Sequence, residues 1–281
     1  MKQEIGSLVI VGTPIGNLGD MSARAIEILK TADLILCEDT RTSAVLTRHF
    51  SIKTPRCALH EHNETQMISK VFQDLVLGKT LALISDAGMP LISDPGYRLV
   101  SALRAKGVKI SLVPGPTALT SALVLSGLPT DSFYFGGFLP NKKNMRMRAF
   151  QDLKALTATL VFYESPRRIE AALMDALCVL GPRKAAIARE ISKLYEEVID
   201  GTLEQIIAHF SACKPKGEMV LMIDGGKKEP LEDELLDKAL TEAMRDDKLS
   251  VAVKKVADRH QLSKGRVYER ALELKAAVEK L

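Results

Sequence analysis

The chain has 281 residues, of which 46% are hydrophobic and 26% charged, and its formal net charge is +4. This composition is typical of a soluble globular protein and excludes a disordered or fibrous chain. No apolar run approaches the ~20 residues that a membrane-spanning helix needs, and the first residues lack the pattern of a signal peptide.

The four cysteines, at positions 37, 57, 178 and 213, are far apart and form no C-x-x-C pair. This spacing argues against a structural zinc site and favours a reducing compartment. We therefore expect a cytoplasmic protein with no metal and no membrane association.

In the first half of the chain, apolar runs predict strands at residues 8–11, 34–37, 81–85 and 109–113, with helical patterns between them. One such helix begins after Ser22 as N-cap and continues through Thr31. Alternating strands and helices indicate βαβ units around a largely parallel sheet. Residues 1–128 are thus expected to form an N-terminal α/β domain.

Strands and helices alternate again after Pro129. Strands are predicted at 159–163, 185–188 and 219–224, and helices at 167–180 and 203–210. A second α/β domain over 129–224 follows, and the glycines, lysines and proline of 225–230 read as a linker. From 231 to 281 the pattern is helical only. Residues 250–259 and 263–280 predict a helix-turn-helix-like pair, with Ser263 as N-cap of the second helix.

The sequence does not match three common binding motifs: a dinucleotide site, a phosphate-binding P-loop and a helical metal site. Gly12, Gly16 and Gly19 do not give the G-x-G-x-x-G of a dinucleotide site. Gln73 stands where a phosphate-binding P-loop needs glycine. The polar segment 60–64 contains two histidines without helical i, i+4 spacing, so a loop that lines a cleft is favoured over a metal site.

Four glycine- and proline-rich loops instead follow successive predicted strands, at residues 11–20, 38–43, 85–96 and 114–118. In an open α/β sheet, ligands bind in the crevice outside such strand ends. Glycine lets the backbone approach a ligand closely and proline keeps it rigid. Tight turns alone would explain one such loop, but four in succession favour a binding site.

The motifs VGTPIGNLGD, CEDTRTS, HEHN, SDAGMPLISDPG, PGPTA, GFLP and FYESPRR together resemble the tetrapyrrole-methylase superfamily, and within it the family of ribosomal RNA small subunit methyltransferase I. The resemblance runs through nearly the whole chain. It implies two α/β domains with S-adenosylmethionine in the cleft between them, and a homodimer. It also implies methylation of the 2′-hydroxyl of a cytidine in the decoding region of small-subunit ribosomal RNA.

The resemblance also implies a set of cofactor-binding positions, taken from the strand-end motifs of both domains. They are Pro14, Ile15, Asp86, Ala87, Gly88, Met89, Thr117, Ala118, Tyr163, Ala188 and Met219. The sequence departs from the family pattern at 89–91, where smaller residues than Met-Pro-Leu are expected, and this puts the local loop packing in question.

Methylation of a ribose hydroxyl needs a general base, because the neutral hydroxyl is a poor nucleophile. The candidates are Asp39, Glu61 and Glu164, with His60 also suited by its ordinary pKa. Asp39 could instead pair with Arg41, and Glu164 with Arg167 or Arg168. The sequence leaves the base open.

Basic residues provide candidate RNA contacts. Segment 141–148 carries Lys142, Lys143, Arg146 and Arg148 and no acid, and Arg41 and Arg167 lie in the strand-end motifs. In the helical tail, Lys264 and Arg266 are candidates, with Lys254, Lys255, Arg259 and Arg270 also expected outside its core. The alternatives are a solvated surface for the segment and a docking or dimerisation bundle for the tail.

Two other functions are compatible with the sequence. A small-molecule methylase of the same fold would act on a tetrapyrrole, although such an activity has no evident need for the basic segment and tail. A non-catalytic RNA-binding protein of ribosome assembly would have no evident need for the carboxylate-bearing loops.

Overall fold

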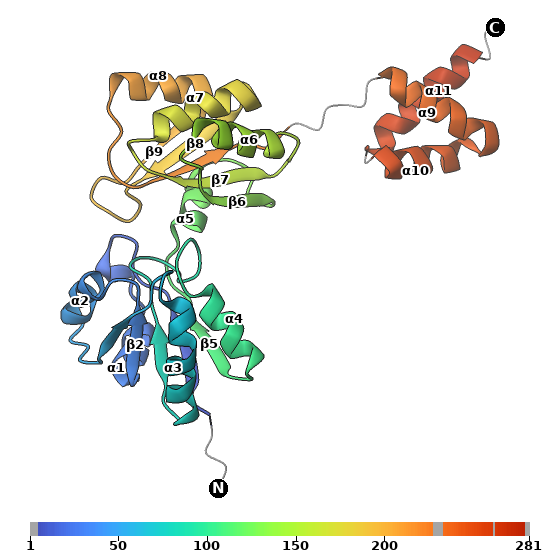
Figure 1. The fold of residues 1–281 in the computed structure, drawn as a ribbon. Helices are drawn as coiled ribbons and strands as arrows, with labels where there is room; N and C mark the ends of the chain where they lie inside the picture. The colour runs from blue at the N-terminus through green and yellow to red at the C-terminus, as the bar shows by residue number, and fades with distance from the viewer. Residues whose placement is uncertain (1–4, 227–232, 261, 279–281) are drawn as a thin grey trace. The chain divides into compact units, whose positions relative to one another are not determined.

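The computed structural model describes residues 5–226, 233–260 and 262–278. Its chain divides into two compact units, residues 1–226 and 227–281, and each is described by itself. Two five-stranded sheets make up the first unit, and helices pack on both faces of each sheet (Figure 1). The second unit is helical.

The first sheet is parallel throughout, with strand order β3-β2-β4-β1-β5. Its strands are β1 (Ser7–Val11), β2 (Leu34–Cys37), β3 (Arg56–Ala58), β4 (Leu81–Leu83) and β5 (Lys109–Val113). Helices α1 (Ala23–Thr31) and α2 (Thr40–His49) cover one face, and α3 (Glu64–Val76) and α4 (Tyr97–Ala105) cover the other. Alternate strand residues, such as Leu8 and Val9, supply the two separate cores, so the strands are buried on both faces.

Several elements of this half begin and end where the sequence predicts, as helix α1 illustrates. The hydroxyl of Ser22 accepts a hydrogen bond from the Ala25 amide at 3.1 Å, and α1 ends at Thr31 as expected. The strands expected at 34–37 and 109–113 are confirmed, whereas β3 was not predicted. Because β3 is a three-residue edge strand, it carries too little apolar patterning to be recognised.

The second sheet has the order β6-β7-β10-β8-β9 and is mostly antiparallel, with only β6 and β7 running parallel. Its strands are β6 (Phe133–Phe138), β7 (Thr159–Glu164), β8 (Lys184–Arg189), β9 (Glu197–Thr202) and β10 (Met219–Ile223). This half is α/β, as expected, and its strand directions differ from those of the first, parallel sheet. Both of its edge strands, β6 and β9, were absent from the prediction.

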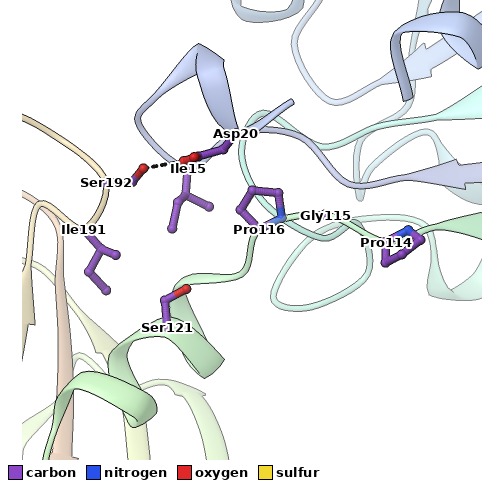
Figure 2. A pocket seen from close by; sticks show the side chains of 8 residues that line it. All are labelled: Ile15, Asp20, Pro114, Gly115, Pro116, Ser121, Ile191 and Ser192. Carbon is purple, nitrogen blue, oxygen red and sulfur yellow. Dashed lines mark hydrogen bonds between the residues drawn. The ribbon is translucent and has the colours of Figure 1, made fainter. Parts of the chain in front are cut away.

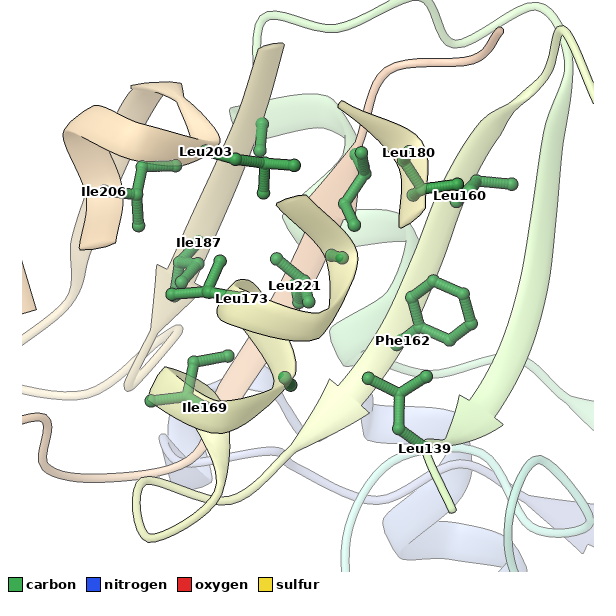
Figure 3. Close-up of a cluster of buried hydrophobic side chains, with 14 of the residues drawn as sticks. Leu139, Leu160, Phe162, Ile169, Leu173, Leu180, Ile187, Leu203, Ile206 and Leu221 are labelled. Atoms are coloured by element: carbon green, nitrogen blue, oxygen red, sulfur yellow. The ribbon is translucent and has the colours of Figure 1, made fainter. Parts of the chain in front are cut away.

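Helices α6 (Lys143–Leu153), α7 (Ile169–Leu180) and α8 (Leu203–Ala212) cover one face of the second sheet. Figure 3 shows apolar side chains of α7 and α8 meeting those of the strands, with Leu173 and Leu221 near the centre. On the other face lies α5 (Ala118–Leu125), through Ala122 and Leu123. The expected boundary at 128/129 separates the two sheets, yet α5 precedes it and packs on the second sheet; the domain division stays a prediction.

The second unit contains α9 (Asp233–Asp246), α10 (Leu249–His260) and α11 (Lys264–Val278). Its core includes Val253, Val256, Ala257, Val267 and Ala271, all of which were expected there. Two basic side chains expected to stay available are instead ion-paired. The Lys255 ammonium lies 2.6 Å from Asp247, and Arg270 Nε lies 2.7 Å from Asp237.

Across the described ranges, no helix combines the length and apolarity required to cross a bilayer. The same residues contain no group of three or more histidine, cysteine or acidic side chains arranged to hold a metal ion.

Candidate functional site

The loops after β1, β4 and β5 meet because these strands are neighbours in the parallel sheet. Thr13 and Gly88 pair through their backbones, with N···O distances of 2.8 and 3.1 Å. The Gly12 amide donates to the Val113 carbonyl at 3.0 Å. Two of the four predicted strand-end loops are therefore joined by main-chain hydrogen bonds, and the first of them is also bonded to the end of β5.

Gly12 and Gly115 lie too close for either to carry a side chain. A Cβ atom on Gly12 would stand 2.7 Å from the Gly115 Cα atom, and one on Gly115 would stand 2.8 Å from the Gly12 Cα atom. These glycines thus allow the first loop and the PGP loop to touch.

The loop from Ser85 to Gly96 has an unusual backbone. Leu91 and Ser93 adopt φ values of +72° and +64°, a region that side-chain-bearing residues rarely occupy. The Asp86 carboxylate accepts a hydrogen bond from the Asp39 amide at 3.1 Å, which ties this loop to the one after β2. Strained backbone held in place by its surroundings is a feature of ligand sites.

These loops form one wall of a cavity of about 360 Å³, and the second sheet and its loops form the opposite wall. This volume is within the ~300–1,000 Å³ range of small-molecule sites. Ten of the expected cofactor positions line the cavity: Ile15, Asp86, Ala87, Gly88, Met89, Thr117, Ala118, Tyr163, Ala188 and Met219. Pro14 is not among the lining residues.

A second hollow of about 580 Å³ shares Ile15 and Ile191 with the first (Figure 2). Its walls come from the first loop, the PGP loop, α5 and the segment after β8. The Ser192 hydroxyl donates a hydrogen bond to the Asp20 carboxylate, which links the two halves of the unit. The two hollows therefore adjoin along the row of predicted cofactor loops.

The carboxyl groups of Asp86, Asp94, Glu164 and Glu218 line the cavity and give it an acidic character. Burial raises the pKa of Asp94 to about 6, the Ser85 hydroxyl partly opposes this rise, and Glu38 and Asp86 add to it. Burial also raises the pKa of Glu38, with Asp86 and Asp39 contributing. The cavity therefore attracts positive charge.

Glu164 lies at the end of β7, lines the cavity and is fully buried. Its Oε1 atom accepts from the Ser165 amide at 2.7 Å, and its Oε2 atom lies 3.0 Å from Arg168 Nη2. Burial raises the pKa of Glu164, against the opposing effects of the Ser165 amide and Arg168. Arg168 in turn donates to the Leu139 carbonyl and the Asn141 side chain. Glu164 therefore takes the ion-paired role, one of the two left open for it, and Arg168 links it to the GFLP loop.

The other two candidates for the general base, Asp39 and Glu61, do not line the cavity. Asp39 caps α2, and its ion pair with Arg41, at 2.6 Å, lowers the pKa of its carboxyl to about 2. Glu61 is exposed and does not line the cavity. Sequence reasoning missed Asp94 and Phe138, which do line it. Their signal was present in the quoted SDPG and GFLP motifs, but nothing in a turn sequence reveals which side chain points inward.

Arg146 corrects one of the expected RNA contacts. Its guanidinium is buried, and its Nη2 atom lies 2.6 Å from the Asp175 carboxylate on α7. It also donates to the carbonyls of Pro140 and Asn141 at 3.3 Å. Arg146 is therefore unavailable to phosphate, because its donors are committed within the fold.

The remaining expected RNA contacts are more accessible. Arg41, Lys142, Lys143, Arg148, Arg167 and Lys264 are exposed, and Arg266 is half-buried at the start of α11. Phe138 lies three residues before the basic segment 141–148, lines the cavity and is 60% exposed. An accessible aromatic ring therefore lies at the cavity close in sequence to the basic residues.

Two packed α/β halves with a loop-lined acidic cavity at the ends of parallel strands define a class of α/β protein with a small-ligand site at its strand ends. The family model of Tetrapyrrole (Corrin/Porphyrin) Methylases matches residues 7–207, and the chain belongs to this methylase family. The expected fold and family are confirmed.

Two relatives show how far the likeness extends. The chain is 47% identical over 233 residues to Ribosomal RNA small subunit methyltransferase I of Halalkalibacterium halodurans, covering 82% of this chain and 81% of that protein. It is 43% identical over 271 residues to the protein of the same name from Mesorhizobium japonicum, covering 96% and 92%.

A solved structure supports the fold alone. The uroporphyrin-III C-methyl transferase of Thermus thermophilus, complexed with S-adenyl homocysteine, matches with a TM-score of 0.53 and 17% identity. The match covers 79% of this chain and 98% of that one.

Proposed function

We propose that this methylase transfers a methyl group from S-adenosylmethionine to the 2′-hydroxyl of a cytidine in small-subunit ribosomal RNA. The observation that carries the proposal is the convergence of ten expected cofactor positions, from both halves of the first unit, on one cavity. The names of the two relatives support ribosomal RNA as the substrate. Such an enzyme would act in the cytoplasm, where ribosomal subunits are assembled.

The cavity suits the cofactor in size and chemistry. Ile15, Met89 and Met219 offer apolar surface, while Asp86 and Glu218 offer carboxylates. S-adenosylmethionine supplies a methyl group on a positively charged sulfur, and an acidic cavity attracts that charge. The loops joined at Thr13–Gly88 and Gly12–Gly115 provide a rigid wall that holds the ligand in one orientation.

Orientation is the main demand of methyl transfer, because the attacking oxygen must lie in line with the bond that breaks. Positioning of this kind contributes up to roughly 7–11 kcal/mol of barrier reduction. On the side of the first sheet, the chain meets this demand with main-chain contacts between short glycine- and proline-containing loops.

The RNA would lie along the exposed basic residues. Lys142, Lys143 and Arg148 neutralise phosphates without specifying bases, and the exposed ring of Phe138 offers a surface on which a base can stack. In the tail, Lys264 and Arg266 at the start of α11 add a second basic contact.

We also propose a homodimer. Three consecutive elements expose large apolar side chains: Leu112 on β5, Val124 and Leu125 on α5, and Phe133 and Tyr134 on β6. Exposed apolar side chains on edge strands are suited to burial against a second copy. Light scattering of the purified protein would reveal the dimer mass, and a monomer at all concentrations would exclude it.

The function is tested by combining calorimetry with methyl transfer. The purified chain should bind S-adenosylmethionine and transfer labelled methyl to small-subunit particles or their RNA. An RNA-binding assembly protein would ignore the cofactor. A small-molecule methylase would bind it but label a tetrapyrrole and leave the RNA unlabelled.

A further inference from the structure

We propose that Asp94 is the group that accepts the proton of the ribose hydroxyl during methylation. This inference rests on the proposed function and fills the role for which the sequence offered Asp39, Glu61 and Glu164. It is drawn from the position of the Asp94 carboxyl, its partners and the roles of the other acids at the cavity.

Asp94 lies in the loop between β4 and α4, directly after Ser93, whose backbone is left-handed with φ +64°. Its side chain lines the same cavity as Asp86, in the same loop. From the opposite wall, Phe138 and Tyr163 line that cavity as well. Asp94 thus shares the cavity with the predicted cofactor positions and with the accessible aromatic ring next to the basic segment.

Two of the other three carboxylates that line the cavity are ion-paired, and the third, Asp86, is assigned to the cofactor in the proposed function. Glu164 is paired with Arg168 at 3.0 Å and Glu218 with Lys193 at 2.9 Å. Asp86 accepts the Asp39 amide at 3.1 Å. Within the described residues, Asp94 makes no salt bridge, so no cation holds its carboxyl in place or stabilises its charge.

The hydrogen bonding of Asp94 is also incomplete. The Ser85 hydroxyl interacts with the Asp94 carboxyl and lowers its pKa, but this hydroxyl donates a hydrogen bond to the Ala87 carbonyl at 3.2 Å. A hydroxyl has only one proton to donate, so it serves one of these acceptors at a time. The Asp94 carboxylate therefore has capacity left for a substrate hydroxyl.

The charged groups facing Asp94 favour its protonated form. The Tyr163 phenol lies across the cavity and is neutral, because burial and the charge of Asp94 raise its pKa. Glu38, on the loop after β2, and Asp86, on the same loop as Asp94, repel the negative charge of Asp94. Together with burial they raise the pKa of the carboxyl to about 6. A base with a pKa just below the working pH is ionised yet strong enough to take a proton.

The reaction balances with Asp94 in this role. The ribose O2′–H bond breaks as its proton moves to the Asp94 carboxylate, and an O2′ electron pair forms the new bond to the methyl carbon. The carbon–sulfur bond breaks, and its electron pair stays on sulfur, which becomes neutral. The products are a methylated ribose, S-adenosylhomocysteine and a protonated Asp94, which returns its proton to water.

Asp94→Asn removes the proton acceptor while keeping the shape of the side chain. We expect the rate of methyl transfer under saturating cofactor and RNA to fall by about 10²–10⁴-fold, with cofactor affinity retained. The matched control is Asp152→Asn, which removes one carboxylate from an exposed position on α6, and should behave as wild type. Wild-type rates in Asp94→Asn would overturn the proposal.

A binding measurement tests the same group without turnover. Near pH 6 the free carboxyl is partly protonated, and a nearby sulfonium favours its ionised form. S-adenosylmethionine should therefore release a proton on binding, measured by calorimetry in buffers of different ionisation enthalpy. S-adenosylhomocysteine, which lacks the positive charge, should release less, and Asp94→Asn should remove the difference.

The two readouts separate the possible failures. If the wild type binds cofactor but never labels ribosomal RNA, the proposed function is wrong, whatever Asp94 does. If the wild type methylates RNA but the proton release near pH 6 is absent, or persists unchanged in Asp94→Asn, the assignment of Asp94 is wrong.

Discussion

The guanidinium of Arg146 on α6 and the carboxylate of Asp175 on α7 form a buried ion pair, in which Nη2 lies 2.6 Å from Oδ2 and Nε 2.8 Å from the same oxygen. Both side chains are less than a tenth exposed. The pair joins two helices on the outer face of the second sheet and, through Arg146, holds the loop at Pro140–Asn141. The basic segment is thus anchored by one of its own arginines.

Arg146→Met should destabilise the first unit, because it leaves the Asp175 carboxylate buried without its partner. Removal of one member of a buried pair typically costs about 3–5 kcal/mol of unfolding free energy. The double variant Arg146→Met with Asp175→Leu should recover much of this loss. Denaturant unfolding of the single and double variants measures both effects, and a single variant as stable as wild type would contradict the structural role.

Reversing the charge of Lys142, Lys143 and Arg148 should act on RNA instead of on folding, because these three side chains are exposed. Each lost phosphate contact reduces the slope of log affinity against log salt by about 0.7–0.9. Binding of small-subunit RNA, titrated at several salt concentrations, gives this slope. Unchanged slope and affinity would mean that the segment is only solvated surface. Cofactor affinity should stay constant in either case.

Arg146 was predicted to contact RNA but is buried in an ion pair, and the sequence contained only part of the information needed to foresee this. Charge alone grouped it with its basic neighbours, although its spacing from Phe150 and Leu153 places all three on one face of α6. The helical period therefore carried a signal for burial that the charge pattern hid. Its partner Asp175 is 29 residues away, and the sequence offers no sign of that contact.

The fold was predictable where local signals are strong. The N-cap at Ser22 and the apolar strands at 34–37 and 109–113 depend on neighbouring residues, and they were located correctly. The edge strands β3, β6 and β9 were missed: β3 has only three residues, β6 (FYFGGF) contains two glycines, and β9 (EVIDGT) mixes charged with apolar residues.

The cavity was predictable because parallel strands bring their carboxyl ends to one edge of the sheet. Asp94 was not singled out, since its inward position depends on the left-handed backbone at Ser93. A serine gives no sequence warning of that conformation, which glycine would have given.

Asp94→Asn should also change the pH dependence of stability. The folded-state pKa of about 6 lies above the ordinary carboxyl value of 3.8, so the folded protein binds this proton more tightly than the unfolded chain. Stability from this group is present below the unfolded pKa and is lost as the pH rises toward 6. The variant lacks this loss, so its melting temperature should exceed that of wild type at pH 8, with the gain shrinking near pH 4. A constant difference across this range would contradict the raised pKa.

A chain that ends at Gly226 should fold and bind cofactor but methylate ribosomal substrate poorly. The first unit extends through this residue, whose amide donates to the Leu156 carbonyl at 2.6 Å, whereas a cut after Asp224 would remove this contact. All expected cofactor positions lie before the cut, and Lys264 and Arg266 lie after it. Thermal melting and calorimetry check folding and binding. Full methylation by the truncated chain would exclude an RNA role for the tail.

The most direct test of the central claim is a map of 2′-O-methyl groups in small-subunit ribosomal RNA after incubation with the purified chain and S-adenosylmethionine. RNA from cells that lack the corresponding gene provides an unmodified substrate. We predict one new 2′-O-methyl group, on a cytidine of the decoding region, that appears only with cofactor and fails to form with Asp94→Asn. Methyl transfer to a base, or to a tetrapyrrole with no change in the RNA, would contradict the account.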